Sequence, residues 1–259
     1  MQHSVLYTVL FAAGVCLVCS LFVAGVSVSL RDRATENALL DQRQKVLRVA
    51  GLLGDNESLE KEEINRRFEE NLVPKLVDMD SGVYLDDPAP AAFNQQKAAR
   101  DPDQSREATP NPAKVRRVAN RGLVYLIKPG DEVEGVILPV EGLGLWGTLY
   151  GYLALAPDTR TVRGLTFYSH KETPGLGGEV DNPRWKALWP GRKATDENGI
   201  PMIKVVKGST GPPEKDPYEV DGLSGATITS NGVTHLMHFW LGKEGFGPYL
   251  ANLREQKGI

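Results

Sequence analysis

The chain has 259 residues, of which 41% are hydrophobic and 24% are charged, and its formal net charge at pH 7 is -3. This length accommodates a membrane anchor together with one or two globular domains. The slightly acidic balance excludes the clustered excess of lysine and arginine that a nucleic-acid-binding surface needs.

The first element is an apolar N-terminal segment, Ser4–Leu30, which contains no Asp, Glu, Lys or Arg. A helix needs roughly 20 apolar residues to cross a hydrocarbon core, and this segment is longer. A cleaved signal peptide would have basic residues before a shorter apolar core, and neither feature is present. The segment therefore predicts a retained transmembrane helix, within an anchor that spans residues 1–33.

Two arginines, Arg31 and Arg33, follow the span, and no Lys or Arg precedes it. Under the positive-inside rule this places the rest of the chain in the cytoplasm, although Asp32 between the arginines makes the bias small.

The chain has two cysteines, Cys16 and Cys19, and both lie in the apolar segment on one helical face. They either pack as small apolar residues or share an iron–sulfur cluster with thiolates of a neighbouring subunit. The remainder of the chain has no cysteine for a disulfide or a thiolate metal site.

The next region, residues 34–120, is predicted to be helical and irregular and to lie near the membrane. An apolar stripe predicts a helix over 33–54 that stops at Gly54. A second helix is predicted from Ser58, as its N-cap, to Pro74, which ends it. The Asp-, Pro- and Ala-rich composition of 81–114 predicts an irregular surface excursion.

Short apolar runs dominate the last region, residues 121–259. Two helical patterns lie among them, at 182–191 and 227–242. Because runs of strands do not alternate strictly with helices, the predicted fold class is α+β, a mixed α/β domain built on a twisted sheet. The predicted strands are 122–128, 135–142, 143–157, 161–170 and 203–208.

Common catalytic motifs are missing from the sequence: there is no GxSxG, no HExxH and no phosphate loop. Residues 142–147, GLGLWG, match GxGxxG, but they run into a strand rather than open a helix, so they do not predict a dinucleotide site. His235 and His238 lie three residues apart on a predicted helix, a spacing that indicates packing or capping more often than metal ligation.

Two glycine-rich loops are the remaining candidates for chemistry. Residues 170–179, HKETPGLGGE, would let backbone approach a flat ligand, or they form a turn without a ligand. Residues 221–233, DGLSGATITSNGV, place Thr227 where a helix begins. Its hydroxyl either caps the helix or lies where a phosphate would be stabilised by the helix dipole.

The two loops together resemble a known family. Asp221–Thr227 resembles the DGxSGAT signature for covalent flavin attachment, and Glu172–Gly177, ETPGLG, resembles the second signature of such FMN-binding domains. With GLWG upstream and one N-terminal span, the layout is similar to that of the C subunit of the Na+-translocating NADH:quinone reductase, a bacterial inner-membrane complex.

This resemblance implies a covalently bound FMN that relays single electrons. The FMN phosphate is attached to the Thr227 oxygen, and the cofactor-binding segment consists of Ser224, Gly225, Ala226 and Thr227. A flavin transferase would transfer FMN from FAD, release AMP and recognise Asp221. The resemblance also implies that the other complex subunits are partners and that the domain lies on the periplasmic side, which overrides the weak arginine bias.

Further residues are assigned to the flavin pocket by the same resemblance. Trp146 has an alternative role as a core residue, and Lys207 would favour reduced, anionic flavin. The assigned residues are Trp146, Thr173, Leu176, Gly177, Lys207 and Gly208.

Two alternatives remain open. One is the homologous flavoprotein subunit of an Rnf-type ferredoxin:NAD+ oxidoreductase, which shares the anchor and the SGAT signature. The other is a membrane-tethered binding or assembly module with no redox role, in which Thr227 only caps a helix.

Overall fold

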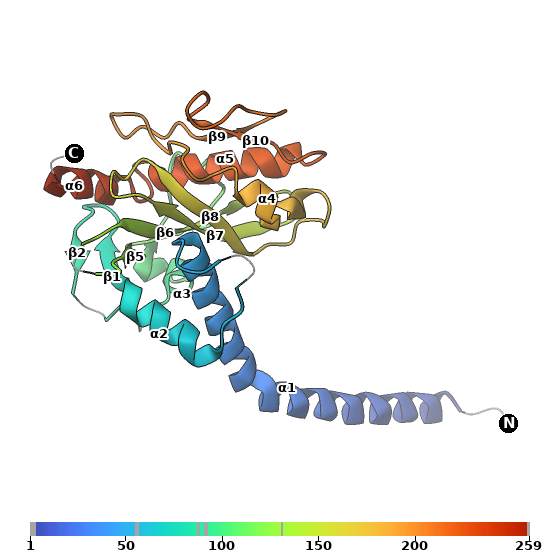
Figure 1. Cartoon of the computed structure of the whole chain (residues 1–259). Coiled ribbons are helices and arrows are strands. Elements are labelled where there is room, and N and C mark those ends of the chain that lie inside the picture. Colours follow the sequence, from blue (N-terminus) through green and yellow to red (C-terminus); the bar gives the residue numbers. More distant parts are fainter. Residues whose placement is uncertain (1–3, 55–56, 87–88, 91–92, 131, 258–259) are drawn as a thin grey trace. The chain divides into compact units, whose positions relative to one another are not determined.

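The N-terminal apolar segment forms the first turns of one long helix, α1 (Val5–Val49), in the computed structural model of the chain (Figure 1). The structure describes residues 4–54, 57–86, 89–90, 93–130 and 132–257. Residues 1–42 and 43–259 form two compact units, which are described separately. The apolar part of α1 is long enough to cross a membrane, and its side chains are exposed. A helix suits that environment because it satisfies its backbone polar groups internally.

The predicted helix over 33–54 is continuous with the predicted span and ends earlier than Gly54. Gly51 adopts a left-handed conformation with φ +77°, and the Leu52 N–H donates to the Leu47 carbonyl at 2.9 Å. This is a Schellman ending, for which glycine is the favoured residue. Val46 and Leu47, in the last turns, are fully buried.

A six-stranded antiparallel sheet forms the centre of the second unit, with strand order β2-β1-β5-β6-β7-β8. The strands predicted at 122–128, 135–142 and 161–170 are confirmed. The strand predicted over 143–157 is interrupted by a tight turn at 144–147 before β7. The strands are β1 (Leu72–Asp78), β2 (Tyr84–Leu85), β5 (Arg121–Ile127), β6 (Gly135–Leu143), β7 (Thr148–Leu155) and β8 (Val162–Ser169).

The second predicted helix is shorter than expected. α2 (Lys61–Asn71) begins after Glu60 rather than at Ser58, and the residues up to Pro74 belong to β1. β1 pairs with β5 along its whole length, and this pairing outweighs the local helical pattern. β2 pairs only with Leu76 and Val77, so β1 is an edge strand at Pro74, where a strand tolerates proline.

The predicted irregular excursion over 81–114 is wrong in part, because it contains regular elements and core residues. These elements are α3 (Gln95–Arg100), the 3-10 turn η2 (Pro102–Gln104) and β3 (Ser105–Arg106), which pairs with β4 (Val118–Ala119). Ala108 and Ala113 are buried in the main core. β1 pairs with β5, so the sheet includes residues on both sides of position 120.

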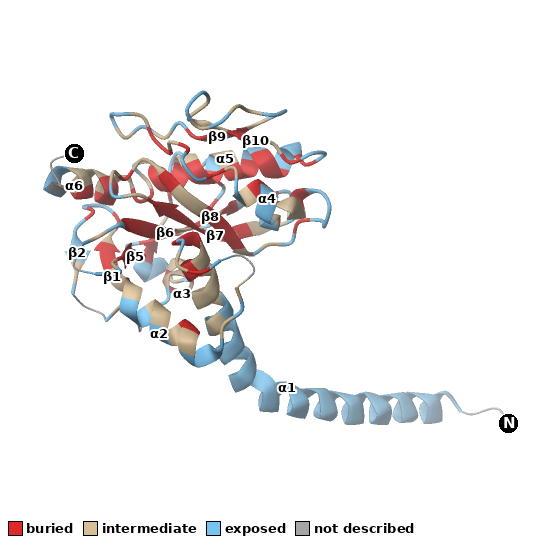
Figure 2. Ribbon diagram, viewed as in Figure 1, coloured by how far each residue is buried: buried red, intermediate tan, exposed pale blue. Residues whose placement is uncertain are grey.

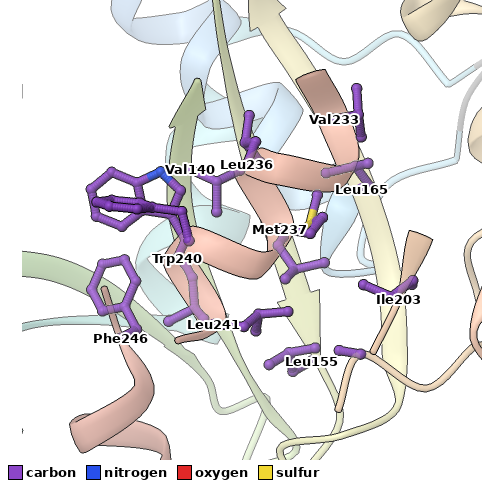
Figure 3. Close-up of a cluster of buried hydrophobic side chains, with 14 of the residues drawn as sticks. Val140, Leu155, Leu165, Ile203, Val233, Leu236, Met237, Trp240, Leu241 and Phe246 are labelled. Atoms are coloured by element: carbon purple, nitrogen blue, oxygen red, sulfur yellow. The ribbon is translucent and has the colours of Figure 1, made fainter. Parts of the chain in front are cut away.

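Helices cover both faces of the sheet in the second unit. α5 (Thr227–Leu241) and α6 (Gly247–Lys257) lie over one face, whereas α2 and α3 lie over the other (Figure 1). The strands and α5 carry most of the buried residues (Figure 2). Figure 3 shows the core between them, where Leu236, Met237 and Trp240 of α5 point toward Val140, Leu155 and Leu165 of the sheet.

The remaining elements lie around α5. They are η3 (Gly177–Asp181), the short helix α4 (Pro183–Lys186) and a parallel pair, β9 (Lys204–Val206) with β10 (Glu219–Asp221). β10 leads into the loop before α5.

Candidate functional site

The N-terminus of α5 begins at Thr227, and the residue in the N-cap position is Ala226. Alanine has no side-chain acceptor, and Ala226 makes no side-chain capping bond. Thr227 is the first helical residue and is exposed. The alternative in which Thr227 caps the helix is therefore wrong. The first turn of this 15-residue helix presents backbone N–H groups and the positive end of its dipole, which together favour an anion.

The turn before α5 is fixed by one hydrogen bond to the helix and by one within the turn. The Leu223 N–H donates to Ser230 Oγ at 3.0 Å, and the Ala226 N–H donates to the Leu223 carbonyl at 3.1 Å. Gly225 has φ +71°, a conformation that glycine adopts without strain. Ser224 and Gly225 are exposed while Leu223 and Ala226 are buried, so the turn presents its polar side outward.

Asp221, predicted to be recognised by a transferase, is engaged within the chain. Its Oδ1 accepts hydrogen bonds from the Thr210 N–H at 2.8 Å and from Thr210 Oγ1 at 2.7 Å. Thr210 Oγ1 also accepts a bond from Arg192 Nη2 at 3.1 Å, and Arg192 is 3% exposed. A buried guanidinium is thus linked to the Asp221 carboxylate through one hydroxyl.

The second glycine-rich loop lies directly beside this turn. A Cβ at Gly225 would approach Leu176 Cδ2 to 3.0 Å, so the two loops are in close contact. Leu176 and Thr173 are exposed, whereas Gly177 is buried at the start of η3. The structure therefore brings together the two loops that the sequence singled out.

Trp146 lies in the 144–147 turn between β6 and β7, and 66% of it is exposed. Its alternative role as a core residue is therefore wrong. The Trp146 and Leu145 N–H groups both donate to Glu172 Oε1, at 2.9 and 3.0 Å. Oε2 of the same carboxylate accepts from Thr229 Oγ1, in the first turn of α5, at 2.6 Å.

Glu172 and Thr229 lie at the candidate site, and sequence reasoning did not assign them individually. Glu172 is part of the ETPGLG signature, but nothing in the sequence reveals that its carboxylate is buried, at 5% exposure, or which amides it binds. Thr229 is fully buried two residues after Thr227, and only the fold shows that its hydroxyl faces another loop.

Lys207 and Gly208 directly follow β9. A Cβ at Gly222 would lie 3.5 Å from Lys207 Cα, so this segment runs beside the start of the DGLSGAT stretch. Both residues are exposed. They lie near Gly222, whereas the Trp146 turn is bonded to Glu172.

These surroundings have the chemistry that FMN needs. Large apolar side chains are exposed on the three converging segments, which suits a flat aromatic ring system. The uncapped first turn of α5 suits a phosphate. The exposed apolar residues are Leu143, Leu145, Trp146, Leu176 and Ile228.

A separate groove of about 360 Å³ lies over β9, β10 and the second half of α5, away from Thr227. His238 lines it, and its Nε2–H donates to the Ile203 carbonyl at 2.8 Å. Burial lowers the pKa of His238. Among the described residues no group of three or more His, Cys, Asp or Glu is placed to hold a metal ion.

Comparison with known proteins defines the class of protein to which the chain belongs. A family model described as the FMN-binding domain matches residues 144–242, which contain the 144–147 turn and both loops. The chain is therefore a flavin-binding protein with an apolar N-terminal helix, and FMN as the predicted cofactor is confirmed.

Comparison with full-length relatives identifies the family within this class. The C subunit of the Na(+)-translocating NADH-quinone reductase from Pseudomonas aeruginosa is 46% identical over 257 residues, covering 98% of each chain. Its counterpart from Vibrio vulnificus is 47% identical and covers 98% of this chain and 97% of its own. The chain belongs to the family formed by the C subunits of the Na(+)-translocating NADH-quinone reductase.

Solved structures agree with this assignment. The crystal structure of Shewanella oneidensis NqrC is 34% identical, has a TM-score of 0.76, and covers 83% of this chain and 98% of that chain. The C subunit from Parabacteroides distasonis is 26% identical with a TM-score of 0.66, covering 85% and 96%. The predicted family and the α+β fold are confirmed, and full-length similarity favours this family over the Rnf-type alternative.

Proposed function

We propose that FMN is attached by a phosphoester to Oγ1 of Thr227 and that the chain relays electrons within the multi-subunit Na+-translocating NADH:quinone reductase. The observation that carries this proposal is an exposed threonine at the first position of a helix whose N-cap is alanine. Its hydroxyl is not used as a cap, and it lies where the helix favours a phosphate.

The residues around Thr227 have separate roles in this proposal. Trp146, Thr173, Leu176 and Gly177 form the wall against the flavin ring, and Lys207 and Gly208, which run beside Gly222, complete the pocket. Bound FMN supplies reversible one-electron chemistry, and the covalent link keeps it from diffusing away between turnovers. The protein contributes binding, orientation and the charge near the ring.

Attachment requires a flavin transferase acting on FAD. In this step the Thr227 oxygen would bond to the phosphorus of the FMN half, the pyrophosphate bond would break, and AMP would leave with the electron pair. The hydroxyl proton would pass to the transferase. A threonine hydroxyl is a poor nucleophile at neutral pH, so the transferase and its metal ion would supply the activation. Asp221 serves this step by holding the turn through Thr210 and by contributing to transferase recognition.

The proposed location is the bacterial inner membrane, with a single pass and the flavin domain on the periplasmic side. The apolar part of α1 supports the anchor. The periplasmic side follows from family resemblance and the need for the transferase.

Denaturing gel electrophoresis tests the attachment directly. Wild-type protein made with the transferase should give a fluorescent flavin band, because a covalent flavin survives denaturation. Thr227→Ala should give a band of equal protein amount without fluorescence, and the reductase that contains it should lose quinone reduction. A fluorescent Thr227→Ala band would refute the attachment site, and unchanged quinone reduction would support a non-redox module.

A further inference from the structure

The side chain of Glu172 joins three segments of the flavin site. It is 5% exposed and lies in the loop that follows β8. One carboxylate oxygen accepts both the Leu145 and Trp146 N–H groups, and the other accepts the Thr229 hydroxyl. The 144–147 turn, the 172–177 loop and the first turn of α5 therefore meet at one carboxylate.

The surrounding backbone leaves room for this carboxylate. A Cβ at Gly144 would lie 2.6 Å from Glu172 Oε1, and a Cβ at Gly177 would lie 2.5 Å from Oε2. Real Cβ atoms do not come that close to a neighbour, so any other residue at these positions would displace the carboxylate. Two glycines of the matched domain are thus explained by the space that Glu172 occupies.

The negative charge of the Glu172 carboxylate is compensated by the dipoles of the groups that donate hydrogen bonds to it. Within the described part of the chain its bonding partners are two backbone amides and one hydroxyl. A buried carboxylate is stable in such surroundings only while these bonds are kept, and removing it leaves two part-buried amides and one buried hydroxyl without their acceptor. The arrangement therefore resists small changes in the relative positions of the three segments.

We infer that Glu172 is a positioning residue that fixes Trp146 against the first turn of α5, two residues from Thr227, and so sets the distance between the flavin wall and the attachment oxygen. This inference rests on the proposed attachment at Thr227. Glu172 does not contact the phosphate or take part in the transfer; it acts through the Trp146 turn and Thr229.

The test compares full-length Glu172→Ala and Glu172→Gln with wild type, each made with the transferase. Glutamine can accept both amides on Oε1 and donate from Nε2 to the Thr229 oxygen, so it should keep at least half of the wild-type flavin loading. Alanine cannot, and its loading should fall at least fivefold. Glu179→Ala, which removes a half-buried carboxylate of η3 that accepts a bond from Asn182, serves as the matched control and should load normally.

A second measurement does not depend on flavin. Hydrogen exchange followed by mass spectrometry on unloaded protein should show faster exchange in the peptide containing Leu145 and Trp146 for Glu172→Ala, wild-type exchange for Glu172→Gln, and unchanged exchange in α6. Unchanged α6 exchange also shows that the variant is folded.

The possible outcomes distinguish the positioning role of Glu172 from the proposed attachment of FMN at Thr227. Wild-type loading or wild-type exchange at Leu145 and Trp146 in Glu172→Ala would overturn the inference, as would equal failure of the alanine and glutamine variants. Absence of covalent flavin from wild-type protein would instead overturn the proposed function, and the exchange data would still decide whether Glu172 holds the turn.

Discussion

Thr210 shows how one hydroxyl can support a loop at the scale of a single residue. It donates to the Asp221 carboxylate and accepts from the buried Arg192, so it lies between opposite charges. Arg192 also donates to the Gly211 and Asp216 carbonyls, at 2.8 and 2.6 Å. The loop that ends at Asp221 is thereby tied to a guanidinium that has little access to water.

We therefore expect Thr210→Val to lower the free energy of unfolding by about 1–3 kcal/mol, because a buried donor and a carboxylate each lose a partner. Flavin loading should also fall, because the turn before Thr227 begins at Asp221. Urea denaturation and loading assays measure the two effects. Ser209→Ala, at the exposed neighbouring position, should change neither, and a Thr210→Val protein of wild-type stability would contradict the argument.

Glu141, near the end of β6, is the residue whose charge state should affect stability most clearly. Burial raises the pKa of its carboxyl from 4.5 to about 7, although Arg100 opposes the shift. Because the pKa is higher in the folded state, the fold favours the protonated acid. The resulting stability is fully present below pH 4.5 and is lost as pH rises through 7.

Raising the pH from about 4.5 to about 8 should therefore cost wild type up to about 3 kcal/mol relative to Glu141→Gln, which stays neutral throughout. Urea denaturation at several pH values checks this difference. Glu255→Gln, at an exposed position of α6, should follow wild type. Parallel pH profiles for wild type and Glu141→Gln would show that burial does not disfavour the charge.

At the scale of elements, the contact between the two loops depends on Gly225. Alanine there would be strained by about 1 kcal/mol at φ +71°, and its Cβ would press on Leu176. Gly175→Ala is a matched control, since Gly175 has φ +76° and a Cβ added there would have no neighbouring atom within 4 Å.

Both variants should lose about 1 kcal/mol of stability by thermal or urea unfolding, because both carry the same backbone strain. Only Gly225→Ala should also lower flavin loading, because only there does the added methyl group displace Leu176. Equal loading of the two variants would mean that the contact between the loops does not shape the site.

The sequence predicts elements well where the pattern is local. Apolar runs and turn residues locate β5, β6 and β8, and the ending at Gly242 closes α5 as expected. β1 was missed because its residues continue a helical pattern, and only pairing with β5, about 50 residues later, makes them a strand. The part of the core formed by Ala108 and Ala113 was missed because isolated alanines among polar residues give no periodic signal.

The same contrast between local patterns and long-range contacts applies to the candidate site. Thr227, Leu176 and Trp146 could be proposed from the sequence because their loops resemble known signatures, and the structure places Thr227 at the N1 position of α5. The buried partners of the site could not be predicted, since burial of Glu172 and its bond to Thr229 depend on contacts between segments 57 residues apart.

At the scale of the whole molecule, the chain combines an apolar helical unit with one domain that contains both loops. The two cysteines of the chain, Cys16 and Cys19, both lie in the apolar helix. A cysteine placed in the domain is therefore a selective chemical label for the side of the membrane on which the domain lies.

We expect Glu255→Cys, at an exposed position of α6, to react with a membrane-impermeant maleimide in cells whose outer membrane has been opened, because the proposed location is periplasmic. In inside-out inner-membrane vesicles it should react only after detergent is added. The reverse pattern would place the domain in the cytoplasm, as the flanking arginines alone suggest.

The mass of one peptide tests the central claim most directly. Trypsin should release Asp216–Lys243, which contains Thr227, from protein made in cells that have the flavin transferase. The account predicts a peptide heavier than its amino acids by FMN less one water, with fragment ions placing the added mass on Thr227. A peptide with the mass of its amino acids alone, or with the flavin on another residue, would contradict it.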